Sequence, residues 1–436
     1  MATMAEHKNK SIIKRKIFPK IFGWRRNGIS LRTKHVAWPT PLVVLWCIFL
    51  PLILFAQEGD PYIHARVKRQ KGETDSALVY IDRAIALQPG KAGYYLFRAD
   101  MYFTKGWIAK AREDYEKANT LEEGSGDYGL ARCYAATEEY GKAIQYLRKH
   151  LSSSYRLSKK DILTDPAFAS MEHTREWKEL WQQEWYTPFD YLVSEVQLKI
   201  AAREYTEAIN QLSYYLKNHP KKHEGYALRA RAYYEMKNFR NALSDLNDAI
   251  EISGRNPAYY KLRGQVRMAL SQYKEAVADY SSSLAIDNSD VELYMLRAEA
   301  LRLAGQTNEA VRDINTYLLY TGYDEQALYT AALAMYDGGN YLQCLSFINK
   351  VIERNKNKAS YFLLRGNAYL KTNMARYAIR DYGMALDLDA SLTEAWVNKG
   401  TARLMTGDKS GACHDWQIAA SRGSSQAVML MQENCL

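Results

Sequence analysis

The residues with the clearest capacity for chemistry are six basic side chains, each followed sixteen residues later by an aspartate. A row of free guanidinium groups would bind an anionic ligand, whereas bases matched to acids would form structural ion pairs. The matching favours ion pairs, because a ligand ladder needs free arginines and leaves the aspartates unexplained. The six couples are Arg98 and Asp114, Arg229 and Asp245, Arg263 and Asp279, Arg297 and Asp313, Arg365 and Asp381, and Lys399 and Asp415.

Side chains suited to catalysis or metal binding show no comparable order. His219 and His223 flank Pro220 in a segment that reads as a loop, so they do not share a helical face suited to a metal pair. The sequence has no glycine-rich phosphate loop, no nucleophile elbow and no Cys-x-x-Cys pair. We therefore expect a non-catalytic protein that needs no cofactor and no metal ion.

The couples belong to a repeat of 34 residues. If its most regular small residue is numbered position 20, position 8 is also small and positions 4 and 24 are large, often Tyr. Positions 4, 8 and 11 share one stripe of a first helix, and positions 20, 24 and 27 share one stripe of a second. The sequence predicts an all-α array of helical hairpins. The residues at position 20 include Ala208, Ala242, Ala276, Ala310, Cys344, Ala378 and Ala412.

This pattern resembles the tetratricopeptide repeat (TPR), whose signature one unit carries at Tyr226, Ala230, Tyr233, Ala242, Leu246 and Ala249. The resemblance implies a TPR solenoid, a right-handed superhelix of hairpins. It covers about three units in residues 57–157 and seven in residues 187–422. Pro61 and Lys68 depart from the signature in the first unit. The whole chain is similar to exported multi-TPR proteins of Bacteroidetes-type bacteria.

The hairpin also explains the couples of base and acid. Positions 7 and 23 each lie eight residues from the turn at position 15, so they sit at the same level of an antiparallel hairpin. The remaining units replace both members together, as with Glu195 and Gln211. We predict six ion pairs at the edges of the hairpin cores.

TPR proteins bind peptides in a concave groove lined by positions 2, 5, 9, 12 and 13 of the first helices, and the resemblance implies the same surface here. The groove would be apolar and suited to a helix or an extended apolar peptide. Leu333 and Leu363 are expected to face it without packing between hairpins. The predicted lining is Met268, Met295, Leu303, Tyr329, Leu333, Tyr336, Leu363, Leu370, Val397, Leu404 and Met405.

One observation and one alternative limit this interpretation of the groove. The TPR clamp for a terminal carboxylate needs Lys at position 5 and Asn at position 9 of one unit, but Lys261 and Asn367 lie in different units. Another part of the solenoid, or the insert at 158–186, could instead cover the groove.

The first 56 residues read as a targeting segment. Ten Lys and Arg residues lie within 1–41, and an apolar run follows at 42–56. That order is typical of a secretory signal cleaved after Ala56, and the alternative is a retained signal-anchor spanning 36–56. We expect an exported, periplasmic or envelope-associated protein, or one anchored in the inner membrane whose only membrane contact is this segment.

Two further segments flank the seven-unit array. Residues 158–186 form a non-canonical helical insert, in which Asp165-Pro166 starts a helix and Trp177, Trp181 and Trp185 share one helical face. That face is either an exposed docking surface or, as we prefer, buried on the solenoid. Residues 423–436 read as a capping helix, and an oxidising compartment would allow a disulfide between Cys413 and Cys435 across the final turn.

The net charge of +10 does not indicate nucleic-acid binding. Outside residues 1–41, the chain has 49 basic and 48 acidic residues and therefore no broad basic face for phosphates. The sequence favours a scaffold or adaptor for other proteins, acting in envelope assembly or secretion. The alternative is a membrane-anchored TPR receptor or regulator.

Overall fold

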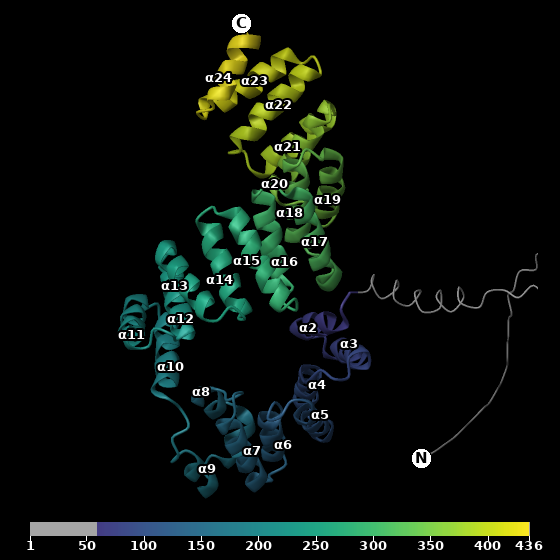
Figure 1. Ribbon diagram of the computed structural model, residues 1–436. Helices are drawn as coiled ribbons and strands as arrows, with labels where there is room; N and C mark the ends of the chain where they lie inside the picture. The colour runs from purple at the N-terminus through teal and green to yellow at the C-terminus, as the bar shows by residue number, and fades with distance from the viewer. Residues whose placement is uncertain (1–58, 436) are drawn as a thin grey trace, which may run out of the picture. The chain divides into compact units, whose positions relative to one another are not determined.

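The computed structural model describes residues 59–435 (Figure 1). The proposed signal or anchor at 1–56 lies outside the described residues. Within 59–435 the structure consists of helices and connecting turns, without a β-strand. The predicted fold class, an all-α stack of antiparallel hairpins, is confirmed.

Ten hairpins pair a first helix with a second. The first helices are α2 (Pro61–Gln70), α4 (Ala92–Thr104), α6 (Asp127–Ala136), α10 (Pro188–Ala201), α12 (His223–Glu235), α14 (Pro257–Ala269), α16 (Glu292–Leu303), α18 (Glu325–Asp337), α20 (Ala359–Lys371) and α22 (Thr393–Met405). The second helices are α3 (Thr74–Leu87), α5 (Ile108–Leu121), α7 (Tyr140–Ser152), α11 (Tyr205–Asn218), α13 (Phe239–Ile252), α15 (Tyr273–Ile286), α17 (Thr307–Thr321), α19 (Tyr341–Arg354), α21 (Ala375–Leu388) and α23 (Lys409–Ser421).

Each hairpin turns through one residue with a positive φ at position 15. Glycine occupies it in five hairpins, where the left-handed conformation carries no Cβ penalty. In the other five, φ lies between 58° and 64° at a residue with a side chain, which costs roughly 1–2 kcal/mol. The turn geometry is therefore kept even where the sequence does not favour it. These five residues are Glu138, Arg203, Lys237, Ser271 and Asn373.

The two helices of a hairpin meet where a small residue at position 8 faces a large one at position 24. A Cβ built on Gly264 would lie 2.5 Å from the Tyr280 ring, and one on Gly366 would lie 2.8 Å from the Tyr382 ring. Where position 8 is alanine, position 24 is usually smaller, as with Ala230 and Leu246. Complementary volume thus sets the separation of the two helices.

This packing predicts opposite signs for two identical substitutions. Gly264→Ala should destabilise by about 1–3 kcal/mol through overpacking, in spite of the better helix propensity of alanine. Gly383→Ala is the matched control, because no heavy atom other than its chain neighbours and the backbone of its own helix lies within 4 Å of its Cβ position in α21. It should stabilise by roughly 0.5–1 kcal/mol. Urea unfolding measures both, and equal effects of the two variants would contradict the packing argument.

The insert folds as three short helices, α8 (Lys159–Leu163), the 3-10 helix η1 (Pro166–Met171) and α9 (Arg175–Leu180). Asp165 caps η1 by accepting a hydrogen bond from the Ala167 N–H at 2.9 Å. The same carboxylate accepts a hydrogen bond from the Tyr128 hydroxyl at 2.7 Å and lies 3.0 Å from Arg132 Nε, so it attaches the insert to α6.

The prediction of one helical face for Trp177, Trp181 and Trp185 is wrong. Helix α9 ends at Leu180, and the Trp185 indole N–H donates to the Leu180 carbonyl at 2.8 Å, which closes the helix end. Thr187 and Pro188 then start α10 with a capping box. A proline disfavours the helical conformation at the residue before it, so α9 does not continue into α10. Trp177 is buried and the other two pack against the same cluster, in agreement with the interpretation that buries them.

The chain ends in α24 (Ser425–Asn434), which packs on α23. Ala427 is buried there beside Trp416, so the helix covers apolar surface that a further hairpin would otherwise cover. Cys413 and Cys435 are joined by a disulfide, with their Cα atoms 5.8 Å apart. Cys133 and Cys344 are buried free thiols.

Candidate protein-binding surface

The six couples of base and acid lie within hairpins and underlie the first-helix surface. In five of them the arginine Nε and Nη2 donate to the carboxylate at 2.6–3.1 Å. All six aspartates are buried. Hydrogen bonding to Asp245 raises the pKa of the Arg229 guanidinium above its ordinary value, so the base stays charged.

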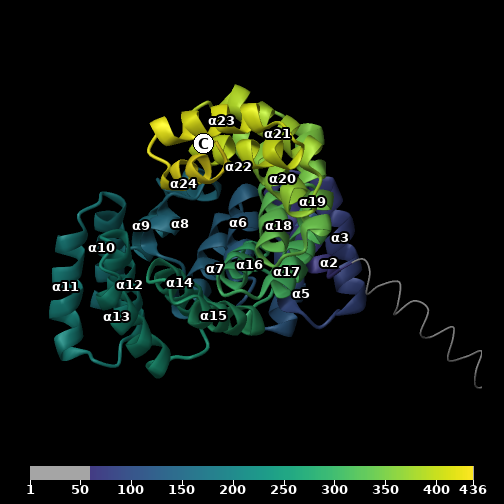
Figure 2. The same ribbon diagram turned by 90° about the horizontal axis from the view of Figure 1, so that it is seen from above.

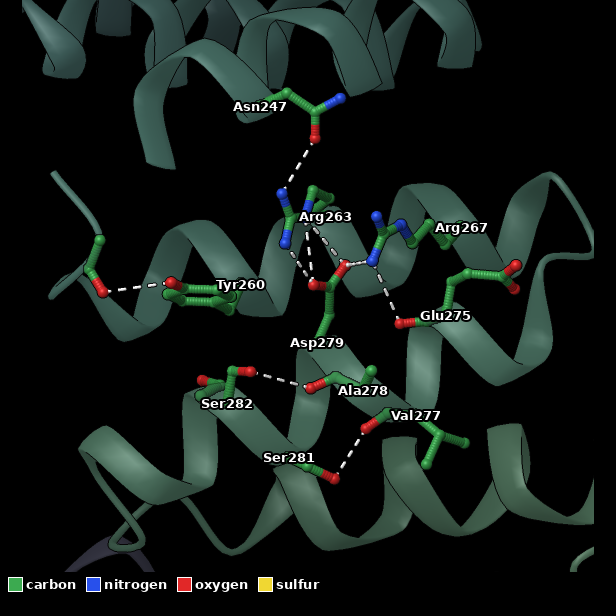
Figure 3. Close-up of polar contacts among 12 residues, drawn as sticks. Asn247, Tyr260, Arg263, Arg267, Glu275, Val277, Ala278, Asp279, Ser281 and Ser282 are labelled. Atoms are coloured by element: carbon green, nitrogen blue, oxygen red, sulfur yellow. Dashed lines mark hydrogen bonds and ion pairs between the residues drawn. The ribbon is translucent and has the colours of Figure 1, made fainter. Parts of the chain in front are cut away.

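Each of these five arginines also contacts the preceding hairpin. Its Nη1 donates at 2.6–3.1 Å to a polar side chain sixteen residues earlier, at Asp82, Ser213, Asn247, Ser281 or Asn349. Figure 3 shows Arg263 between Asn247 and Asp279. We call this contact the arginine bridge. Because both sides of each guanidinium are occupied, these arginines do not form a ladder for an anionic ligand.

Two of the aspartates have a second basic partner at position 11. Arg267 Nη1 donates to Asp279 at 2.7 Å, as Figure 3 shows. In the last unit Lys399 Nζ lies 3.6 Å from Asp415, and Arg403 Nη1 donates to the same carboxylate at 2.8 Å. The TPR-like signature has Tyr at position 11. Arginine at this position therefore indicates a second partner for the aspartate, which a comparison of positions 7 and 23 alone does not reveal.

Ten of the eleven residues predicted to line the groove are half-buried or exposed. Leu303 is 38% exposed and Met405 is 49% exposed, at the ends of α16 and α22. The prediction for Val397 is wrong, because this residue is buried beside Ala412 and Ala427. The last hairpin and the capping helix therefore use it as core.

Leu333 and Leu363 also differ from the expectation. Both pack against an apolar cluster shared by α18, α19, α20 and α21, so they help to join neighbouring hairpins. The Tyr329 ring lies 4.9 Å from the Tyr361 ring at the same junction. A charge at either leucine would disturb packing as well as any ligand, which makes them poor probes of binding.

The first-helix face is more polar than predicted. Arg302 on α16 donates to Glu299 at 2.7 Å and to Asp337 on α18 at 2.6 Å. Glu394 on α22 is exposed and accepts a hydrogen bond from the Asn367 amide at 2.9 Å. These residues occupy groove positions 2, 9, 12 and 13, and reading every residue at those positions would have found them.

The two residues that resemble parts of a carboxylate clamp are engaged elsewhere. Lys261 Nζ forms an ion pair with Asp290 at 2.6 Å. The Asn367 oxygen accepts from the Tyr382 hydroxyl at 2.8 Å and from the Asn398 amide at 3.0 Å. Neither side chain is set to receive a free carboxylate.

Residues 59–435 offer no group of three or more His, Cys, Asp or Glu side chains placed to hold a metal ion. In the same range, no helix has the length and apolar character needed to cross a membrane.

The family model of the tetratricopeptide repeat matches residues 62–127 and 194–259. These segments cover hairpins α2–α5 and most of α10–α13, whose geometry the other hairpins share. The matched segments are tetratricopeptide repeats, and together with the shared hairpin geometry they support a multi-TPR protein.

Among curated proteins, this TPR chain is similar to Hsc70-interacting proteins 1 and 2 of Drosophila melanogaster. It is 32% identical to each over 97 residues, which are 22% of the chain. The match spans only about a quarter, 26%, of the length of these relatives.

Solved TPR structures resemble parts of the chain. The C-terminal part of a TPR repeat-containing protein from Cytophaga hutchinsonii is 19% identical, covers 54% of this chain and 97% of its own, and has a TM-score of 0.46. A TPR protein from Parabacteroides merdae is 18% identical, covers 55% of this chain and 95% of its own, with a TM-score of 0.42. The TPR family is generally non-catalytic, and its fold supports a scaffold for interactions between proteins.

Proposed function

We propose that this protein is a non-catalytic scaffold whose first helices α16 to α22 bind an amphipathic segment of another protein. The observation that carries the proposal is a first-helix face that combines partly exposed apolar side chains with acid groups. Leu303 on α16 and Met405 on α22 are exposed on the outermost helices of this surface, and the Glu394 carboxylate is exposed on α22.

The charges favour a partner segment that combines apolar and basic side chains. Within the described residues, Glu394 is hydrogen-bonded by the neutral amide of Asn367 instead of a cation. Arg302 pairs with both Glu299 and Asp337, so one of these two acids is also uncompensated. A Lys or Arg of the partner would complement this excess, while its apolar side chains would cover Leu303 and Met405.

The proposal predicts a separation of binding from folding. Leu303→Asp with Met405→Asp should lower affinity for the main partner by at least tenfold, because an unpaired carboxylate would be buried in an apolar interface. Both side chains are already exposed, so melting should be unchanged. Leu342→Asp, at a site 69% exposed on second helix α19, is the matched control.

Quantitative affinity purification from native envelopes should identify the partner, and titration of the purified pair measures affinity. Unchanged partner recovery by the folded double variant would exclude this surface. Equal losses in the double variant and in Leu342→Asp would point to a general charge effect.

The site of action is a second part of the proposal. We place the solenoid outside the inner membrane, in envelope assembly or secretion, with a cleaved segment 1–56 or an anchor at 36–56. The basic-then-apolar order of that segment supports export, and so does the Cys413–Cys435 disulfide, because disulfides persist in oxidising compartments.

The export proposal predicts a mature N-terminus near Gln57. N-terminal sequencing of protein from the envelope fraction measures it. An intact basic segment would instead support the anchored receptor, and recovery of the whole protein in the cytosol with reduced Cys413 and Cys435 would exclude both.

A further inference from the structure

Helix α2 contacts a part of the stack that lies more than 200 residues further along the chain. Ile63 and Val67 are buried in one apolar cluster with Val291, Leu301 and Tyr317. α2 lies beside α17 in Figure 1, and the turned view of Figure 2 agrees. We call the contacted surface, formed by residues 287–292 and 317–324, the rim.

Polar contacts reinforce this apolar one. The Tyr320 hydroxyl accepts a hydrogen bond from the Asp60 backbone N–H at 3.1 Å, and its ring lies 4.8 Å from the His64 ring. Arg66 donates to the Ser289 hydroxyl, and Lys71 donates to the Thr321 carbonyl. These bonds join both ends of α2 to the rim.

The sequence of α2 divides into two faces. Ala65 belongs to the core of its own hairpin, together with Ala77 and Ile81. Ile63 and Val67, four residues apart, belong to the cluster of the rim. The residues that hold the hairpin together are therefore different from those that hold it to the rim.

Charge and packing both suit a contact that can open. Arg66 and Arg69 of α2 line one cavity together with Asp290 and Glu292 of the rim, and Lys71, the C-cap of α2, lines another with Asp324. Cavities of about 420 Å³ and 290 Å³ lie along the contact. Complementary charge gives orientation, but the cavities leave part of the apolar surface without close packing.

The packing between α10 and the hairpins that precede the insert is also sparse. Elsewhere in the stack a first helix packs on the second helix of the preceding hairpin, as α14 does on α13. The main partners of α10 are α11 and α12, and its other flank borders a cavity of about 560 Å³ next to the loop 153–158 and the start of α8. Leu198 is 55% exposed on that flank, and the Arg156–Asp190 ion pair at 3.1 Å crosses the joint.

We propose that the rim is a docking site for a basic helix with an aliphatic pair, and that this chain fills it with its own α2. The contact is a clasp between the hairpins before the insert and those after it. When the clasp opens, the two sets of hairpins separate at α10, and the rim becomes available to another helix of the same chemistry.

The test measures a distance across the clasp. Spin labels are placed at Val79→Cys on α3 and Leu342→Cys on α19, both exposed, in a full chain with Cys47→Ser. The parent should give one narrow distance distribution. Ile63→Asp with Val67→Asp should lower the ratio of closed to open molecules by at least tenfold, because carboxylates would replace apolar side chains buried against the rim. Circular dichroism should show unchanged helicity.

Two further variants make the result decisive. Tyr320→Ala attacks the clasp from the rim and should open it also, even if the α2 variant fails to fold. Leu87→Asp places a carboxylate on the exposed surface of α3, where the side chain is 53% exposed, and should keep the parent distance. The parent distance in folded Tyr320→Ala would overturn the proposal, as would the parent distance in a folded α2 variant.

Discussion

Replacing Asp279 with alanine should lower the free energy of unfolding around α14 and α15 by about 3–5 kcal/mol, because it strands buried charge. The carboxylate is 2% exposed and accepts hydrogen bonds from Arg263 and Arg267. Without it, two guanidinium groups lose their acid, and Arg263 keeps only neutral partners, the Asn247 side chain and the Tyr260 ring. Removal of one member of such a network costs far more than the intact network contributes.

A cycle of variants tests the pairing. Adding Arg263→Ala to Asp279→Ala should recover part of the loss, while Arg267 still lacks an acid, and adding Arg267→Ala should recover more. Hydrogen exchange of α14 and α15 with urea unfolding measures each step. Glu275→Ala, an exposed acid on the same helix, should change stability by no more than about 0.5 kcal/mol. Strictly additive losses would show that the three side chains are not coupled.

Acidification should weaken the hairpin α6–α7 through His150. Burial lowers the pKa of this imidazole from 6.5 to about 4, and the side chain lies against the Tyr128 ring at 5.0 Å. Its Nε2 accepts a hydrogen bond from the Leu157 N–H at 3.1 Å, which requires the neutral ring. Above pH 6.5 neither state binds the proton, and the stabilisation from the neutral form is complete.

Between pH 6.5 and pH 4 the unfolded chain binds the proton while the folded chain does not. The free energy of unfolding therefore decreases as the pH is lowered through this range. The loss should be about 2 kcal/mol at pH 5 and about 3 kcal/mol at pH 4, where it levels off. His150→Gln should remove this part of the pH dependence, and His173→Gln, at an exposed position, is the control. Urea midpoints followed by tryptophan fluorescence, to which Trp177 contributes from the apolar cluster shared with α7, measure it. Identical pH slopes for the parent and His150→Gln would refute the assignment.

The hairpins could be predicted because their determinants repeat at fixed spacing. Alanine or glycine at position 8 and a large residue at position 24 define the contact between two helices, and Gly264 with Tyr280 shows how closely they must match. The couple Arg263 and Asp279 could be predicted because positions 7 and 23 lie equally far from the hairpin turn, on opposite sides of it. Its third member Asn247 did not, since it lies on the preceding hairpin.

The parts that escaped prediction depend on contacts outside the period. Ile63 and Val67 lie in the unit that departs most from the signature, and nothing in their spacing indicates Tyr317 as a neighbour. Trp185 was assigned to a helix by its spacing, but its indole N–H bonds to the carbonyl at the end of α9. Val397 was placed on the surface because the pattern does not record that a capping helix covers the last unit.

The arginine bridge has a consequence for how such a chain can change its length. Each bridge joins a residue to another sixteen positions earlier, and the acceptor is a Ser, Asn or Asp side chain in every case. If residues 223–256 were deleted as one period, Arg263 would meet Ser213, the acceptor that Arg229 uses now. The junction thus accepts either neighbour, so whole units can be lost or duplicated by recombination without a compensating substitution.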